Sequence, residues 1–162
     1  MIRSFNKWKP CISDKAIVDE LAVIIGNVIV HDLASIWPCA MIRGGKNAVV
    51  IEKNVAIMDR AFIEAHKKVV VEEGSIISHA AILHGSKIGK NVLIGIGAIV
   101  LEVSIGDNSI VATGSVVTKN FDKNSFIAGI PARRIREVKK EEKEKIKETL
   151  KEIRENAKYL SV

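Results

Sequence analysis

Residues 88–117 read IGKNVLIGIGAIVLEVSIGDNSIVATGSVV, and one aliphatic side chain recurs through this stretch at an almost constant interval. The recurring residues stand six apart, with a single step of five in the middle: Ile88, Ile94, Val100, Ile105, Val111 and Val117. A period of six fits neither an amphipathic helix, which repeats every 3.6 residues, nor one continuous alternating strand. It is typical of short strands separated by corners, so this interval decides the fold.

The same ladder extends over most of the chain. The earlier members, which we call rungs together with the six above, are Ile12, Val18, Ile24, Val30, Ile36, Ile42, Ile51, Ile57, Ile63, Val71, Ile77 and Leu83. The position four residues after a rung was not used to set the frame, yet it is small or β-branched in 14 of 18 cases, Ser104 among them. Lys46, Lys67 and Lys87 are exceptions, and they fall where the step changes length. The repeat is therefore supported by a second, independent position.

Short strands with one large and one small inward side chain predict a narrow interior. We predict an all-β fold for residues 1–135, a parallel β-helix in which three hexapeptides form one triangular coil. The 18 rungs predict about six coils. The repeat stops after Val117, and Gly129-Ile130-Pro131-Ala132 precedes a change of composition.

Residues 136–162 have the pattern of a C-terminal amphipathic α-helix. Apolar residues recur there at intervals of three and four: Ile146, Leu150, Ile153, Ala157 and Leu160. Glu141 also stands four residues before Lys145, a spacing that supports a helix. We expect the apolar stripe to pack on the outside of the β-helix rather than on a membrane.

Composition narrows the class of protein. The chain has 162 residues, of which 48% are hydrophobic and only 4% aromatic, so aromatic stacking on single-stranded nucleic acid is disfavoured. The net charge is +6, but residues 133–158 alone hold 11 Lys and Arg against 7 Asp and Glu, and the rest is nearly balanced. We expect no nucleic-acid partner, no membrane segment and a cytoplasmic location with Cys11 and Cys39 reduced. Glutamine is absent while Lys and Glu abound, a bias of thermophile proteins.

Three of the four histidines lie within 19 residues: His66, His79 and His84. Imidazole is a common ligand of zinc, iron and cobalt, so this clustering indicates a metal site. His79 is two residues after a rung and His84 is one after the next rung, so they belong to successive sides of the prism. If both bind one ion, the second histidine must come from another subunit. A triangular prism with sides at 120° naturally assembles as a trimer, so we predict a homotrimer with metal at the subunit interfaces. His31 is apart from the cluster and is expected to be an ordinary outward side chain.

Several stretches resemble the γ-class carbonic anhydrase family, including its members once described as ferripyochelin-binding proteins. They are Ser35-Ile36-Trp37-Pro38, Ala40-Met41-Ile42-Arg43-Gly44, Ser78-His79-Ala80-Ala81-Ile82-Leu83-His84-Gly85, Ile88-Gly89-Lys90-Asn91-Val92-Leu93-Ile94-Gly95 and Gly129-Ile130-Pro131-Ala132-Arg133. The resemblance implies a left-handed β-helix and a homotrimer. It also implies an interface metal, zinc or else iron or cobalt, with His84 from one chain and His79 from the next.

The third ligand is open between two residues. Aligned without gaps, the family's first ligand histidine falls on Glu64, and His66 follows two residues later. Glu64 and His84 each stand one residue after a rung and three rungs apart, so they should stack on the same side of adjacent coils. A His-His-Glu set is a known zinc environment, whereas His66 could serve if the irregular Lys67-Lys68 step reshapes the backbone. A third alternative is that no first ligand forms and the metal is bound weakly or lost.

Other departures concern catalysis. The candidate catalytic residues are Arg43 and Asp59; the family's Arg-Gly-Asp reads Arg43-Gly44-Gly45, which leaves Asp59 as the possible partner of Arg43. The family's substrate-orienting asparagine and glutamine are replaced by Ala56 and Met58.

Three functions follow as hypotheses. The first is a carbonic-anhydrase-like lyase, whose metal-bound hydroxide hydrates carbon dioxide, with activity weak or lost. The second is a hexapeptide acyltransferase that uses acyl-CoA, with a histidine as general base for a small-molecule acceptor. The third is a non-catalytic trimeric scaffold or ligand binder.

Overall fold

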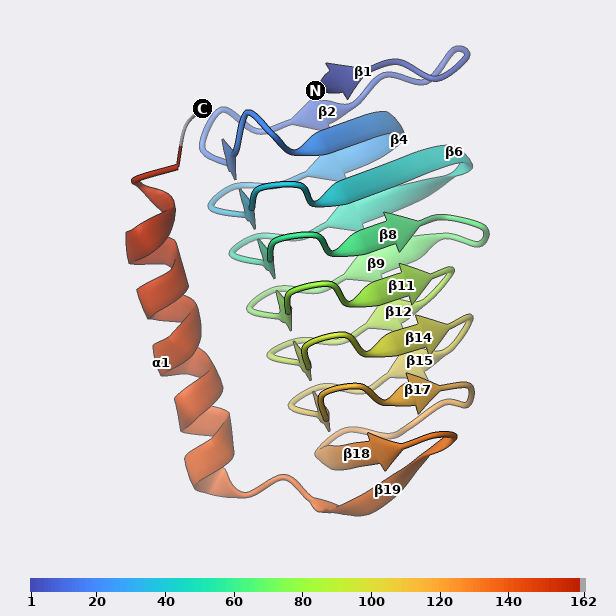
Figure 1. The fold of residues 1–162 in the computed structure, drawn as a ribbon, viewed down its shortest axis with the longest axis vertical. Helices are drawn as coiled ribbons and strands as arrows, with labels where there is room; N and C mark the ends of the chain where they lie inside the picture. The colour runs from blue at the N-terminus through green and yellow to red at the C-terminus, as the bar shows by residue number, and fades with distance from the viewer. Residues whose placement is uncertain (161–162) are drawn as a thin grey trace.

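The computed structural model describes residues 1–160 as a left-handed parallel β-helix with a single α-helix along one side (Figure 1). The coils stack along one axis, and each short strand pairs in parallel with the equivalent strand of the next coil. Three flat faces result, and α1 covers one of them. The expected fold class is therefore confirmed.

Face 1 is the face under α1. It consists of β3 (Ile17–Val18), β5 (Ser35–Ile36), β7 (Ala56–Ile57), β10 (Ile76–Ile77), β13 (Leu93–Ile94), β16 (Ile110–Val111) and β18 (Ser125–Gly129), with β19 (Ala132–Glu137) antiparallel to β18. Seven parallel strands on this face mean about seven coils, one more than the rungs predict. The additional coil is built on Phe121 and Ile127, which pair with Ile105 and Val111.

Face 2 follows face 1 in each coil, and face 3 completes the coil. Face 2 consists of β1 (Ile2–Arg3), β8 (Phe62–Glu64), β11 (Ile82–His84), β14 (Ile99–Leu101) and β17 (Val116–Val117). Face 3 consists of β2 (Cys11–Ile12), β9 (Val69–Val71), β12 (Lys87–Ile88) and β15 (Ser104–Ile105). The long strands β4 (Val23–Val30) and β6 (Met41–Ile51) run through both faces.

The rungs fill the interior. Sixteen of the 18 are buried, most with no exposed surface, and the other two, Ile12 and Val18 in the first coil, pack against that core. The small inward residue stands two positions before the next rung. This position is also four residues after the previous rung only when the two rungs are six residues apart. The prediction for Ser104 is therefore wrong: the five-residue step leaves it exposed and buries Val103 instead.

The helix α1 (Lys140–Ala157) packs on face 1 of its own chain. Its buried residues Ile146 and Leu150 belong to one apolar cluster with Ala56, Ile76 and Ile110, whose side chains point outward from face 1. The helix begins four residues later than position 136 because β19 extends to Glu137, and residues 161–162 of the predicted helix lie outside the described residues. Within residues 1–160, no helix combines the length and apolarity required to cross a membrane.

The first turn of α1 is anchored to β19 by a bidentate ion pair. Arg136 Nη1 and Nη2 each donate to a Glu142 carboxylate oxygen at 2.7 Å, and the Lys139 N–H donates to the same carboxylate at 2.8 Å. The Arg136 hydrogen bonds, followed by that from Lys139, lower the pKa of Glu142 from 4.5 to about 2. The charged carboxylate therefore stabilises the docked helix.

We predict that Ile77→Ala lowers the free energy of unfolding by about 3 kcal/mol, because it leaves a cavity at a side chain with no exposed surface. Ile96→Ala is the matched control, because Ile96 is 52% exposed and the same truncation there should cost less than about 0.5 kcal/mol. Urea unfolding followed by circular dichroism measures both. Equal losses would contradict the inward position of the rung.

We predict that Glu142→Gln costs about 1 kcal/mol at neutral pH, since it removes the charge that Arg136 pairs with. The pKa of Glu142 is lower in the folded chain, so its contribution is complete above about pH 4.5 and disappears as the pH falls toward 2. Thermal unfolding between pH 7 and 2 should show a smaller acid loss in Glu142→Gln than in the natural chain. Glu148→Gln, an exposed change in the same helix, should leave the acid profile unchanged.

Candidate functional site

Two groups of polar side chains lie at opposite ends of the strands of face 2. Asp59 and His79, which we call the corner pair, precede β8 and β11 at the corner between faces 1 and 2. The second group, which we call the His84 cluster, lies where the strands of face 2 end. Its members are Arg43, Glu64, His66, Lys67, His84 and Glu102.

The corner pair brings a carboxylate against an imidazole. His79 Nδ1 lies 2.9 Å from Asp59 Oδ2, and the two side chains are 44% and 34% exposed. Each residue stands two positions after a rung, so the stacking of coils places one above the other, and the Ala80 N–H donates to the Asp59 carbonyl at 2.9 Å. The contact leaves Nε2 as the ring nitrogen that Asp59 does not engage.

A shallow depression of about 400 Å³ surrounds the corner pair, lined also by Pro38, Cys39 and Arg60. The residue after each stacked position has a left-handed backbone, with φ of 60° at Cys39, 58° at Arg60 and 56° at Ala80. Non-glycine residues seldom adopt this conformation, and here it turns the chain sharply onto face 2. The depression is open to solvent in the single chain.

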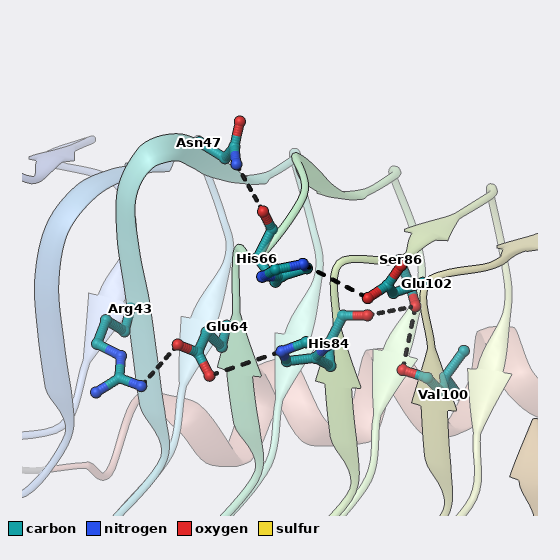
Figure 2. Close-up of polar contacts among 8 residues, drawn as sticks. All are labelled: Arg43, Asn47, Glu64, His66, His84, Ser86, Val100 and Glu102. Atoms are coloured by element: carbon teal, nitrogen blue, oxygen red, sulfur yellow. Dashed lines mark hydrogen bonds and ion pairs between the residues drawn. The ribbon is translucent and has the colours of Figure 1, made fainter.

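The His84 cluster is built on a column of stacked polar side chains (Figure 2). Arg43, Glu64 and His84 occupy equivalent positions in β6, β8 and β11, each one residue after a rung. Arg43 Nη2 donates to Glu64 Oε1 at 2.7 Å, and Glu64 Oε2 lies 3.9 Å from His84 Nε2. The column thus places a guanidinium, a carboxylate and an imidazole in order along the β-helix axis.

His66 joins this column from the corner beyond β8. Its ring stacks on that of His84, with centroids 5.2 Å apart and planes 12° from parallel. Asn47 Nδ2 donates to the His66 carbonyl at 2.6 Å and holds the corner in place (Figure 2). Both residues proposed for the third ligand position, Glu64 and His66, therefore lie beside His84.

Glu102 closes the far end of the cluster. One of its oxygens lies 2.6 Å from Lys67 Nζ and the other 3.7 Å from His66 Nε2. The hydrogen bond from Lys67 lowers the pKa of Glu102 below its ordinary value. Sequence reasoning missed this pair, because the steps beside Lys67 and Glu102 are eight and five residues long and positions there cannot be counted in sixes.

The sequence predictions for individual residues have different outcomes. The stacking of Glu64 with His84 is confirmed by their pairing in β8 and β11. The pairing of Arg43 with Asp59 is wrong, because Arg43 bonds Glu64 and Asp59 contacts His79. The sequence held a signal for both observed pairs. Arg43 and Glu64 each stand one residue after a rung, and Asp59 and His79 each stand two residues after one, so the members of each pair lie in one column.

The donor set of one chain does not fit a metal ion. Among residues 1–160, no group of three or more His, Cys, Asp and Glu side chains is arranged to hold one. His79 and His84 lie at opposite ends of β11, and Glu64 is already bonded to Arg43.

Comparisons with known proteins find a matching family and a similar curated protein. Residues 86–119 match the family described as the hexapeptide repeat of succinyl-transferase. The carnitine operon protein CaiE of Escherichia coli strain K12 is 33% identical over 144 residues, which are 86% of this chain and 74% of CaiE. The similarity to CaiE therefore extends over most of both chains.

Solved structures are similar to all or most of the chain. A Bacillus cereus protein assigned as an acetyltransferase superposes with a TM-score of 0.94 at 29% identity, covering 98% of this chain and 95% of that one. A galactoside acetyltransferase in complex with coenzyme A superposes with a TM-score of 0.60 at 25% identity, covering 79% and 68%. These two similar structures are described as acetyltransferases.

The same similarities correct the hypothesis of a zinc lyase. The interpretation of the chain as a metal-binding carbonic-anhydrase-like enzyme is wrong, because three similar solved structures are described as acetyltransferases, a serine acetyltransferase of Neisseria gonorrhoeae among them. The resemblance to the γ-class family is confirmed only in the hexapeptide repeat that it shares with these transferases.

Proposed function

Because the chain belongs to the hexapeptide-repeat family that includes the carnitine operon protein CaiE, we propose that it is an acyltransferase that uses acyl-CoA. The acceptor is a hydroxyl or amine of a small molecule. The observation that carries the proposal is the contact of 2.9 Å between Asp59 and His79 in an open depression. The similarity to acetyltransferases, one of them in complex with coenzyme A, supports the choice of acyl donor.

His79 is the general base in this proposal. With Nδ1 beside the carboxylate, the ring keeps Nε2 for the acceptor, and the negative charge of Asp59 stabilises the imidazolium that forms when Nε2 takes a proton. The half-exposed position lets a substrate reach the ring without a movement of the coil. Asp59 acts through His79 and is a positioning residue.

Acceptor, acyl-CoA and His79 together account for every bond and proton in the proposed reaction. The acceptor oxygen or nitrogen attacks the thioester carbonyl while His79 Nε2 removes its proton, and a tetrahedral intermediate forms. The intermediate collapses as the carbon–sulfur bond breaks, and the imidazolium returns the proton to the leaving thiolate. The products are the acylated acceptor and free coenzyme A.

A trimer completes the site in this proposal. Face 2 carries an outward apolar stripe, each member one residue before a rung: Met41, Phe62, Ile82, Ile99 and Val116. An uncovered stripe of this kind favours contact with another protein surface. A second copy packed here would close the depression beside His79 and bring a neighbouring His84 cluster toward it.

We predict that His79→Ala lowers kcat/KM for acyl transfer by about 10²-fold to 10⁴-fold, because it removes the general base. Asp59→Asn should give a smaller loss that falls mainly on kcat, since the carboxylate orients the ring and binds no substrate. Release of coenzyme A from acetyl-CoA, followed with a thiol reagent across a panel of hydroxyl and amine acceptors, measures both.

His31→Ala is the matched control, because the His31 ring lies 3.9 Å from Glu52 on another part of the coil, away from the corner pair. It should leave the rate unchanged. Full activity in His79→Ala would contradict the assigned base. Absence of transfer in the natural chain with every acceptor would favour the non-catalytic scaffold.

We predict that the 17.7 kDa chain sediments as a trimer and that Ile82→Asp dissociates it, since a charge would be buried in the apolar stripe. Val70→Asp is the control on face 3, where the same change should leave the trimer intact. Analytical ultracentrifugation distinguishes the two. A natural chain that sediments as a monomer would refute the assembly.

A further inference from the structure

We propose that the groove between α1 and the corners that precede face 1 binds the phosphate chain of a small polyphosphate anion. The groove has a volume of about 290 Å³, and its polar lining comes from Asn54, Glu73, Lys90, Asn91, Lys147, Lys151 and Arg154. It lies before the strands of face 1, whereas the corner pair lies after them. The argument for this groove therefore uses none of the residues of the corner pair.

The two walls of the groove present cations toward each other. Lys147, Lys151 and Arg154 stand four and three residues apart on one flank of α1, beside the buried Leu150. Lys90 extends from the opposite wall, at the corner before β13. Four positive side chains from two rigid elements thus surround one small space.

These cations are largely unpaired. Within the described part of the chain, no carboxylate lies within 4.0 Å of the Lys90, Lys151 or Arg154 charge, and Lys147 alone has a partner, Glu144 at 3.2 Å. Among residues 1–160, Glu73 is the single carboxylate that lines the groove. Convergent positive charge without counterions creates a potential that attracts an anion.

The positive side chains of α1 that line the groove lie on one flank of the helix. Five glutamates recur at intervals of three and four along the neighbouring solvent-facing side, and none of them lines the groove: Glu141, Glu144, Glu148, Glu152 and Glu155. A solvated helix stabilised by its own ion pairs would alternate the two signs along each flank, yet only one such pair is present in α1. The separation concentrates positive charge on the wall of the groove.

The lining favours phosphate over a simple carboxylate. A single carboxylate needs one or two cations, whereas a chain of phosphates carries several charges that match cations spread along a helix. Asn54 and Asn91 lie on the β-helix wall, which also carries Lys90. Their side-chain amides can donate hydrogen bonds without adding charge. The number and spacing of donors therefore fit a polyphosphate.

Sodium triphosphate tests the proposal by calorimetric titration of the full chain at low ionic strength. The natural chain should bind one triphosphate per chain, and Lys151→Glu should weaken binding at least tenfold. Lys140→Glu is the matched control, because it makes the same charge change in the same exposed helix about 16 Å from Lys151. It should change the affinity no more than twofold.

Circular dichroism should show that both variants keep the helix. No binding to the natural chain, or equal weakening by the two variants, would overturn the proposal. Coenzyme A, titrated in parallel, identifies the source of the phosphates. If Lys151→Glu weakens coenzyme A as well, the groove holds the phosphates of that substrate; if coenzyme A binds as before, the groove serves a separate phosphate-bearing ligand.

Discussion

The parallel backbone ladder between successive coils is the constraint on which the rest of the structure depends. Each strand bonds to its equivalent in the next coil, as the Ser78 N–H does to the Ile94 carbonyl at 2.9 Å. Equivalent positions therefore lie above one another, roughly 4.8 Å apart. Rungs stack into a core that α1 does not enter. Outward residues stack into columns, so a polar side chain can contact the equivalent side chain of the next coil.

The functional groups are consequences of this stacking. Asp59 meets His79, and Glu64 lies between Arg43 and His84, because the members of each group have the same distance from a rung. The ladder also separates the two groups, since a strand of face 2 stands between them. The interfacial acyltransferase site is inferred from a depression that is open in one chain and lies beside the apolar stripe of face 2.

Much of this architecture could be predicted from the sequence, because a rung is large and aliphatic and, beyond the first coil, buried. The inward position near Ser104 could not be counted, because a five-residue step removes one residue and moves the burial to Val103. The aligned Arg-Gly-Asp motif points to Asp59 as the partner of Arg43. The stacking of coils instead places Glu64 beside Arg43, because both stand one residue after a rung. The reaction could not be predicted from the repeat, because the same β-helix occurs in lyases and in acyltransferases. The histidines alone do not distinguish a metal ligand from a general base.

Binding of acetyl-CoA by the natural chain tests the central claim most directly. Calorimetric titration at physiological ionic strength should show saturable binding with one site per chain, displaced by free coenzyme A. Absence of binding at millimolar acetyl-CoA would contradict the assignment as an acyltransferase.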